Sequence, residues 1–142
     1  GRVRCHNVTH VARQMATSIH YVHSKKVVHR DIKGENYLLD RQDFTDANCR
    51  VVLTDFGAAV SGGPEDRITG VAGTKTFWAP ECWCGVYGPK VDTWALGIVL
   101  YTVLSGHYPF KTESEIMAKM LKPLHHASPE CADFITRLIE RN

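Results

Sequence analysis

The sequence lacks long runs of charged or apolar residues. Its 142 residues include 17 basic and 15 acidic side chains, which leave a formal net charge of +2. Binding to nucleic acid or to an anionic membrane surface needs a concentrated charge patch, so neither partner is expected. The longest apolar stretch, residues 94–104, is too short to cross a bilayer and contains Gly97 and Thr102. We expect a buried helix there and no membrane span.

The sequence also lacks the cysteine pattern of a disulfide-rich protein. Five cysteines lie at scattered positions, and such an odd set does not form a disulfide framework. We therefore expect reduced thiols, as is usual for an intracellular protein. Residues 1–7 carry charge, but no apolar region follows them, so no signal peptide is visible. The expected location is intracellular and cytoplasmic.

Apolar side chains at three- and four-residue intervals predict the first helix. The stripe consists of Val8, Val11, Ala12, Met15, Ile19 and Val22. Asn7 is the expected cap of this helix. Residues 92–104 are apolar on nearly every side, which predicts a helix enclosed by its neighbours. Farther on, Thr112 and Glu115 form a capping-box pattern, and Ser128-Pro129 offers a cap and a first-turn proline.

Short β-prone runs occupy the first third of the chain between these helices. They are residues 27–28, 37–39 and 51–53. Residues 40–50 are polar and longer than a tight hairpin needs, which predicts a surface loop. The predicted fold class is mainly α with short β-hairpins.

Two short motifs adjoin the predicted strands. Residues 29–36 read HRDIKGEN and lie between the first two strands, and residues 55–57 read DFG and follow the third. The side chains that can carry chemistry are Asp31, Lys33, Asn36 and Asp55. This combination is typical of phosphoryl transfer, in which catalysis rests on positioning and on neutralising phosphate charge.

Each of the four side chains suits a separate task. Asp31 would orient the acceptor hydroxyl and take its proton. Lys33 would hold a compact positive charge against the transferring phosphate. Hard Mg²⁺ ions need oxygen ligands, which the Asn36 amide and the Asp55 carboxylate would supply.

These motifs resemble those of the eukaryotic protein kinase family. The resemblance continues in family order through Gly73-Thr74, residues 79–81 (APE), residues 92–97 (DTWALG) and residues 105–110 (SGHYPF). It implies a protein-kinase-like large lobe, with residues 1–142 forming a partial catalytic domain. No glycine-rich loop of the G-x-G-x-x-G type precedes the HRDIKGEN motif. We therefore expect a chain truncated at both ends, with the small nucleotide-binding lobe absent.

The implied function is ATP-dependent transfer of the γ-phosphoryl group to serine or threonine hydroxyls of protein substrates by the parent protein. Lysine two residues after the catalytic aspartate is similar to the serine/threonine type. The resemblance assigns catalysis to Asp31 and Lys33, ATP binding to Lys33, Asn36, Leu38 and Asp55, and Mg²⁺ binding to Asn36 and Asp55. With one lobe, the chain alone is expected to be inactive. The alternative is a pseudokinase or a kinase-like scaffold or interaction module without catalysis.

The resemblance implies further roles outside these residues. Thr74 is expected to contact the catalytic base and lysine, and Asp92 to accept hydrogen bonds from the backbone of the catalytic loop. Arg30 would be held by an anionic group on the activation loop. Residues 58–78 are polar and glycine-rich, so we expect them to be mobile without such an anchor. Thr69 is the best phosphosite there, which implies an upstream activating kinase.

Overall fold

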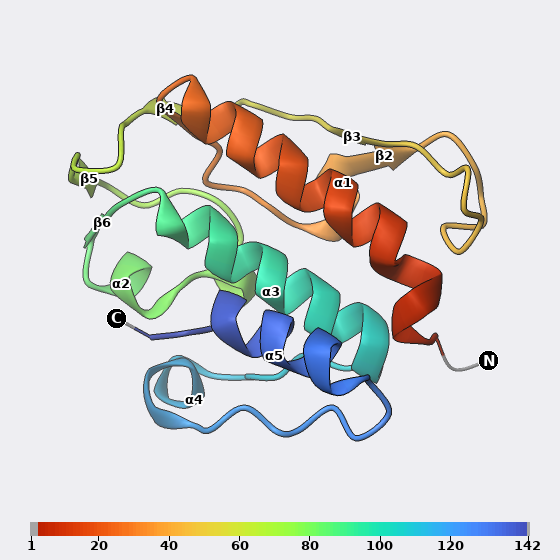
Figure 1. Ribbon diagram of the computed structural model, residues 1–142. Coiled ribbons are helices and arrows are strands. Elements are labelled where there is room, and N and C mark those ends of the chain that lie inside the picture. Colours follow the sequence, from red (N-terminus) through yellow and green to blue (C-terminus); the bar gives the residue numbers. More distant parts are fainter. Residues whose placement is uncertain (1–2, 142) are drawn as a thin grey trace.

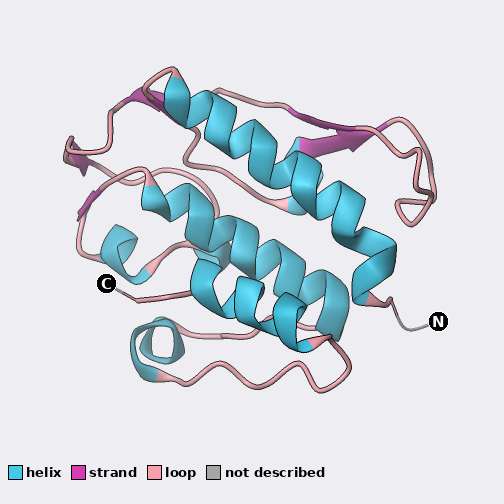
Figure 2. Ribbon diagram, viewed as in Figure 1, coloured by secondary structure: helices cyan, strands magenta, loops and turns pink. Residues whose placement is uncertain are grey.

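The structure, a computed structural model, describes residues 3–141. Its helices are α1 (Cys5–Ser24), α2 (Pro80–Trp83), α3 (Lys90–Ser105), α4 (Glu113–Ala118) and α5 (Pro129–Leu138). Its strands are β1 (Val27–Val28), β2 (Tyr37–Leu39), β3 (Val51–Leu53), β4 (Val60–Ser61), β5 (Ile68–Thr69) and β6 (Val86–Tyr87). The helix α3 lies between α1 and α5 (Figure 1), and the short strands lie around the edge of this helical body (Figure 2).

The strands form three two-stranded antiparallel sheets. The three strands predicted from β-prone runs are confirmed as β1, β2 and β3. Only β2 and β3 form a hairpin, in which Tyr37 lies opposite Leu53. The pair β1–β4 and the pair β5–β6 join segments separated along the chain. The predicted class, mainly helical with short strands, agrees with these two-stranded sheets. The sequence did not predict β4, β5 and β6, because two-residue strands leave no periodic pattern.

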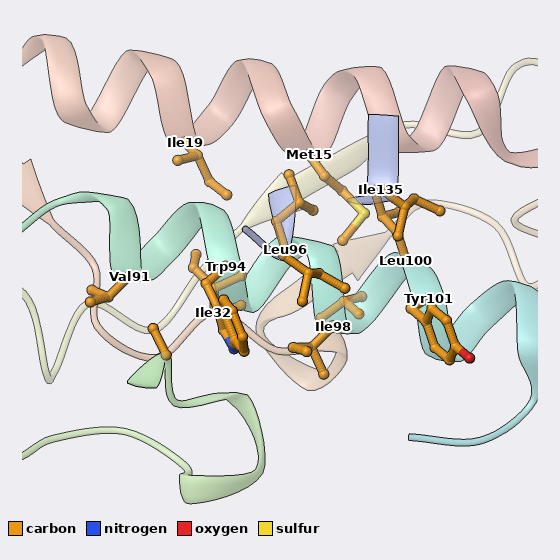
Figure 3. Close-up of a cluster of buried hydrophobic side chains, with 14 of the residues drawn as sticks. Met15, Ile19, Ile32, Val91, Trp94, Leu96, Ile98, Leu100, Tyr101 and Ile135 are labelled. Carbon is orange, nitrogen blue, oxygen red and sulfur yellow. The ribbon is translucent and has the colours of Figure 1, made fainter. Parts of the chain in front are cut away.

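The helix α3 is the centre of the core. Ten of its 16 residues are buried, which confirms the prediction of a helix enclosed by its neighbours. Figure 3 shows Met15 and Ile19 from α1 and Ile135 from α5 around its side chains. Gly97 allows α5 to lie close, because a Cβ atom at this position would be 2.5 Å from Ile139 Cγ1. Burial of apolar side chains on several faces of α3 supplies most of the stabilisation in such a core.

The helix ends agree with the sequence in two cases of three. Thr112 Oγ1 accepts a hydrogen bond from Glu115 N, and Ser128 Oγ accepts one from Cys131 N, so both predicted caps are confirmed. The prediction of Asn7 as the cap of α1 is wrong. The helix begins at Cys5, and Arg4 occupies the cap position without a side-chain hydrogen bond. The first turn of α1 thus extends beyond the capping residue that the local pattern favours.

The cysteines differ from expectation. Cys5 and Cys131 form a disulfide, with their Cα atoms 6.6 Å apart, so the expectation of reduced thiols is wrong for this pair. Their separation of 126 residues hides the pairing from the sequence. The pairing becomes possible because the first turns of α1 and α5 meet in the fold. Cys49, Cys82 and Cys84 are free.

None of the described helices is long and apolar enough to cross a membrane. The apolar stretch at 94–104 belongs instead to the buried part of α3.

Candidate active site

Asp92 of α3 fixes the backbone that carries the HRDIKGEN motif. Its carboxylate is 1% exposed and accepts hydrogen bonds of 2.9 Å from both His29 N and Arg30 N. His23 Nε2 of α1 donates a third bond of 2.8 Å. The role expected for Asp92 is confirmed. Three donors offset the desolvation of this buried group, so the start of the loop is attached to the central helix.

His29 connects the two motifs. Its Nδ1 accepts a hydrogen bond from Asp31 N over 3.1 Å, so its ring hydrogen lies on Nε2, which donates to Thr54 O over 3.0 Å. The imidazole is completely buried and meets the Phe56 ring edge-on, with centroids 4.9 Å apart. His29 therefore holds the loop against the segment that leads into DFG, and it has no open face for a substrate.

Asp31, Lys33 and Thr74 form a compact polar cluster. Thr74 Oγ1 donates to Asp31 Oδ1 over 3.1 Å, and Lys33 Nζ donates to Thr74 Oγ1 over 3.1 Å. Lys33 Nζ also lies 3.8 Å from Asp31 Oδ2. The contacts expected for Thr74 are confirmed. The side chains of Asp31 and Lys33 are 17% and 25% exposed, so a carboxylate and an ammonium group face solvent side by side in a fixed geometry.

Asn36 is buried beside this cluster with its amide nitrogen turned inward. Asn36 Nδ2 donates to Asp31 O over 2.7 Å and to Asp31 Oδ2 over 3.2 Å. Both neighbours are acceptors, which determines the orientation of the amide. Among the described residues, none donates a hydrogen bond to Asn36 Oδ1. This oxygen remains available for a cation.

Asp55 lies at the same end of the β2–β3 hairpin as Asn36. Thr54 N donates to Asn36 O over 2.8 Å, so the residue before Asp55 is tied to Asn36. Asp55 is exposed and has φ of 61°. Within the described part of the chain, its carboxylate accepts one hydrogen bond, from Gly57 N over 3.3 Å. The site thus offers an amide oxygen and a carboxylate, which is a donor set that fits Mg²⁺.

Gly73 explains how Thr74 reaches the loop of the HRDIKGEN motif. Its φ is +82°, and a Cβ atom at this position would overlap Arg30 O. Glycine alone combines this backbone conformation with so close an approach. Sequence reasoning had used Gly73 only as part of a motif. A glycine directly before a functional threonine was the available signal for a close backbone contact.

The guanidinium of Arg30 is held by uncharged groups. Arg30 Nε donates to Ala58 O over 2.6 Å, and Nη1 donates to Tyr87 Oη over 3.2 Å. Tyr87 belongs to β6, which pairs with β5, where Thr69 is exposed.

The segment 58–78 contains β4, which pairs with β1, and β5, which pairs with β6. Its glycine-rich composition did not predict these strands. Sequence reasoning missed Tyr87, because nothing local indicates its partner.

Leu38 lies on the outer face of the β2–β3 hairpin. It is 57% exposed, and its cross-strand neighbour Val52 is 61% exposed. Two large apolar side chains side by side on a surface indicate a contact with another molecule or segment. Their position on the hairpin that ends at Asn36 and leads to Asp55 brings this apolar face to the same region as the oxygen donors.

Comparisons with known proteins identify the family of the chain. The family model described as protein kinase domain matches residues 1–142, and the chain belongs to this family. CDPK-related kinase 1 of Arabidopsis thaliana is 34% identical in an alignment 139 positions long, which covers 91% of this chain and 24% of the relative.

Two further relatives are similar over comparable lengths. Calcium/calmodulin-dependent serine/threonine-protein kinase 1 of Oryza sativa subsp. japonica is 33% identical in an alignment 142 positions long, which covers 93% of this chain and 23% of the relative. A probable serine/threonine-protein kinase KIN1 homolog of Enterocytozoon bieneusi is 36% identical in an alignment 135 positions long, which covers 89% of this chain and 22% of the relative. The chain thus spans about a quarter of the length of these relatives.

Proposed function

We propose that residues 1–142 form a partial serine/threonine kinase catalytic domain, a large lobe truncated at both ends, and that the parent protein transfers the γ-phosphoryl group of ATP to protein hydroxyls. The observation that carries this proposal is the cluster in which Asp31, Lys33 and Thr74 contact one another beside the inward-turned amide of Asn36. Serine or threonine as the acceptor is supported by relatives named serine/threonine-protein kinases.

In this proposal Asp31 acts on the acceptor hydroxyl. Its Oδ1 accepts a hydrogen bond from Thr74, and its Oδ2 faces Asn36 and Lys33. These contacts keep the carboxylate in one orientation, from which it can accept the proton of an incoming hydroxyl. Lys33 is close enough to place its charge against the transferring phosphate without leaving the cluster. The protein contributes positioning and charge, which are the main requirements of phosphoryl transfer.

Asn36 Oδ1 and the Asp55 carboxylate would hold Mg²⁺, and the exposed Leu38 would lie under the adenine ring. The metal, when bound, neutralises charge on the phosphate oxygens. The apolar face of Leu38 and Val52 suits a flat purine. An upstream kinase that phosphorylates the exposed Thr69 is part of the same proposal, as is a small lobe that covers the nucleotide.

Two variants test this division of roles in the full-length parent protein. Asp31→Asn should reduce phosphate transfer to a basic protein substrate by at least about 100-fold and leave nucleotide affinity within about twofold, because the carboxylate contacts the acceptor hydroxyl. Asp55→Asn should instead weaken Mg²⁺-dependent ATP binding, measured by calorimetry. Asp133→Asn, a change at an exposed ion pair with Arg137, is the matched control.

Three outcomes contradict parts of the proposal. Loss of ATP affinity in a folded Asp31→Asn protein would mean that Asp31 contributes to nucleotide binding, and the roles assigned to Asp31 and Asp55 would be wrong. Efficient transfer by residues 1–142 alone would show that the site needs no second lobe. A full-length protein that binds ATP and Mg²⁺ but transfers no phosphate would favour the kinase-like scaffold.

A further inference from the structure

The disulfide between Cys5 and Cys131 lies away from the catalytic cluster. Cys5 is the first residue of α1, and Cys131 lies in the first turn of α5. Their Cα separation of 6.6 Å is within the range that a disulfide spans without backbone movement.

The surroundings of this pair allow exchange with small thiols. Both cysteines are half-buried and line an open groove between α1, α5 and the end of α3. Arg4, Arg13 and Glu130 line the same groove, so polar small molecules can reach the pair. Cys49 and Cys82 are buried, and the exposed Cys84 has no sulfur partner.

We propose that Cys5 and Cys131 form a reversible, redox-sensitive link between α1 and α5. This property goes beyond the proposed kinase activity. In the intracellular location expected from the sequence, the oxidant is a low-molecular-weight disulfide such as oxidised glutathione. The thiolate of Cys5 attacks one glutathione sulfur, forms a mixed disulfide and releases one glutathione thiolate. The thiolate of Cys131 then attacks the Cys5 sulfur and releases the second.

The electrons and protons of this exchange balance. The two protein thiols lose two electrons and two protons, and one molecule of oxidised glutathione becomes two molecules of reduced glutathione. Excess reduced glutathione reverses both steps, so the link reports the ratio of the two forms.

The link has a structural consequence because both helices pack on α3. The helix α1 also packs against β1 and β3, and β1 leads directly into the HRDIKGEN motif. Joining the first turns of α1 and α5 closes a loop of 126 residues around α3. Separation of these helices then requires either breakage of the bond or movement of both together. The oxidised protein should open less often at α1 and α5.

The pairing itself is tested by differential alkylation of the purified full-length protein. The protein is equilibrated with oxidised or with reduced glutathione, denatured in the presence of one alkylating reagent, reduced, and treated with a second reagent of different mass. After oxidation, a peptide pair joining Cys5 to Cys131 is expected, with the first reagent on Cys49, Cys82 and Cys84. Alkylation of all five cysteines after oxidation, or a different pairing, would overturn the proposal.

The consequence is tested by hydrogen exchange on the same two states. Reduction should accelerate amide exchange in the first turns of α1 and α5 by about tenfold or more. Cys5→Ser and Cys131→Ser should exchange like the reduced protein in either buffer, and Cys84→Ser should respond like the unmodified protein. The comparison of oxidised and reduced protein needs no variant. A change of less than about twofold between them would refute the link between α1 and α5.

Discussion

Replacement of Asp92 is the most direct test of how α3 supports the active site. Asp92→Ala removes the acceptor of His29 N, whose bond is buried, and of Arg30 N, whose bond is part-buried. No other acceptor is bonded to these two N–H groups within the described residues. His23, whose side chain is 22% exposed, can turn to solvent and recover a partner. The loss should therefore come mainly from the two backbone groups.

The magnitude follows from the price of leaving these donors unpaired. A buried N–H without a partner costs about 1–3 kcal/mol, so His29 N contributes about that much and the part-buried Arg30 N contributes less, with about 6 kcal/mol as the upper limit for Asp92→Ala. Asp92→Asn retains one acceptor oxygen and should lose about 1–3 kcal/mol. A domain of this size has a free energy of unfolding of about 5–15 kcal/mol in total, so the alanine variant should be severely destabilised.

Replacement of Asp92 should also lower the activity, because it should displace Asp31. Arg30 has φ of 69°, a conformation that is held here by its bond to Asp92 and is costly for a non-glycine residue. Without that bond the backbone can relax, and Asp31 is the next residue. A displacement of about 1 Å in a reacting group can lower a rate by about 100-fold. Asp92→Asn in the parent protein should therefore lose activity beyond its loss of folded protein.

Urea denaturation of the variants measures the stability term. Asp133→Asn is the control, since its exposed pair with Arg137 should contribute no more than about 0.5 kcal/mol. The reasoning is refuted if Asp92→Ala loses as little as this control.

Two further predictions concern the core. Gly97→Ala should lower the free energy of unfolding, measured in urea, by about 1–3 kcal/mol despite the better helix propensity of alanine, because its Cβ would meet Ile139. Gly34→Ala is the control, since there is open space around the new atom, and it should change this free energy by less than about 0.5 kcal/mol. Equal effects of the two changes would contradict this packing. Burial raises the pKa of the Cys82 thiol from 9.0 to about 12 and that of Tyr37 from 10.0 to about 12. Unfolding then releases a proton from Cys82 above pH 9 and another from Tyr37 above pH 10, so the free energy of unfolding should fall by about 1.4 kcal/mol per proton and pH unit up to about pH 12. Cys82→Ala should remove the part that begins near pH 9, and an unchanged curve in this variant would refute that assignment.

Features encoded by neighbouring residues could be predicted from the sequence. The stripe that forms α1, the apolar α3 and the caps at Thr112 and Ser128 all depend on side chains within a few positions. Asp31, Lys33 and Asn36 were found for the same reason, since all three lie in one short loop and their contacts with one another are local. Family resemblance supplied the long-range contacts of Thr74 and Asp92, which no local pattern contains.

The contacts that sequence reasoning missed all join segments far apart in the chain. Arg30 meets Tyr87 across 57 positions, and Cys5 meets Cys131 across 126. The first contact depends on pairing between β5 and β6, whose two-residue strands are too short to show alternation. The second depends on α1 and α5 packing on the same central helix with their first turns together. In both cases the residue types permit many partners, and only the completed packing around α3 selects one. The same packing connects Asp92 to the catalytic loop, so the stability of α3 and the geometry of Asp31 should change together.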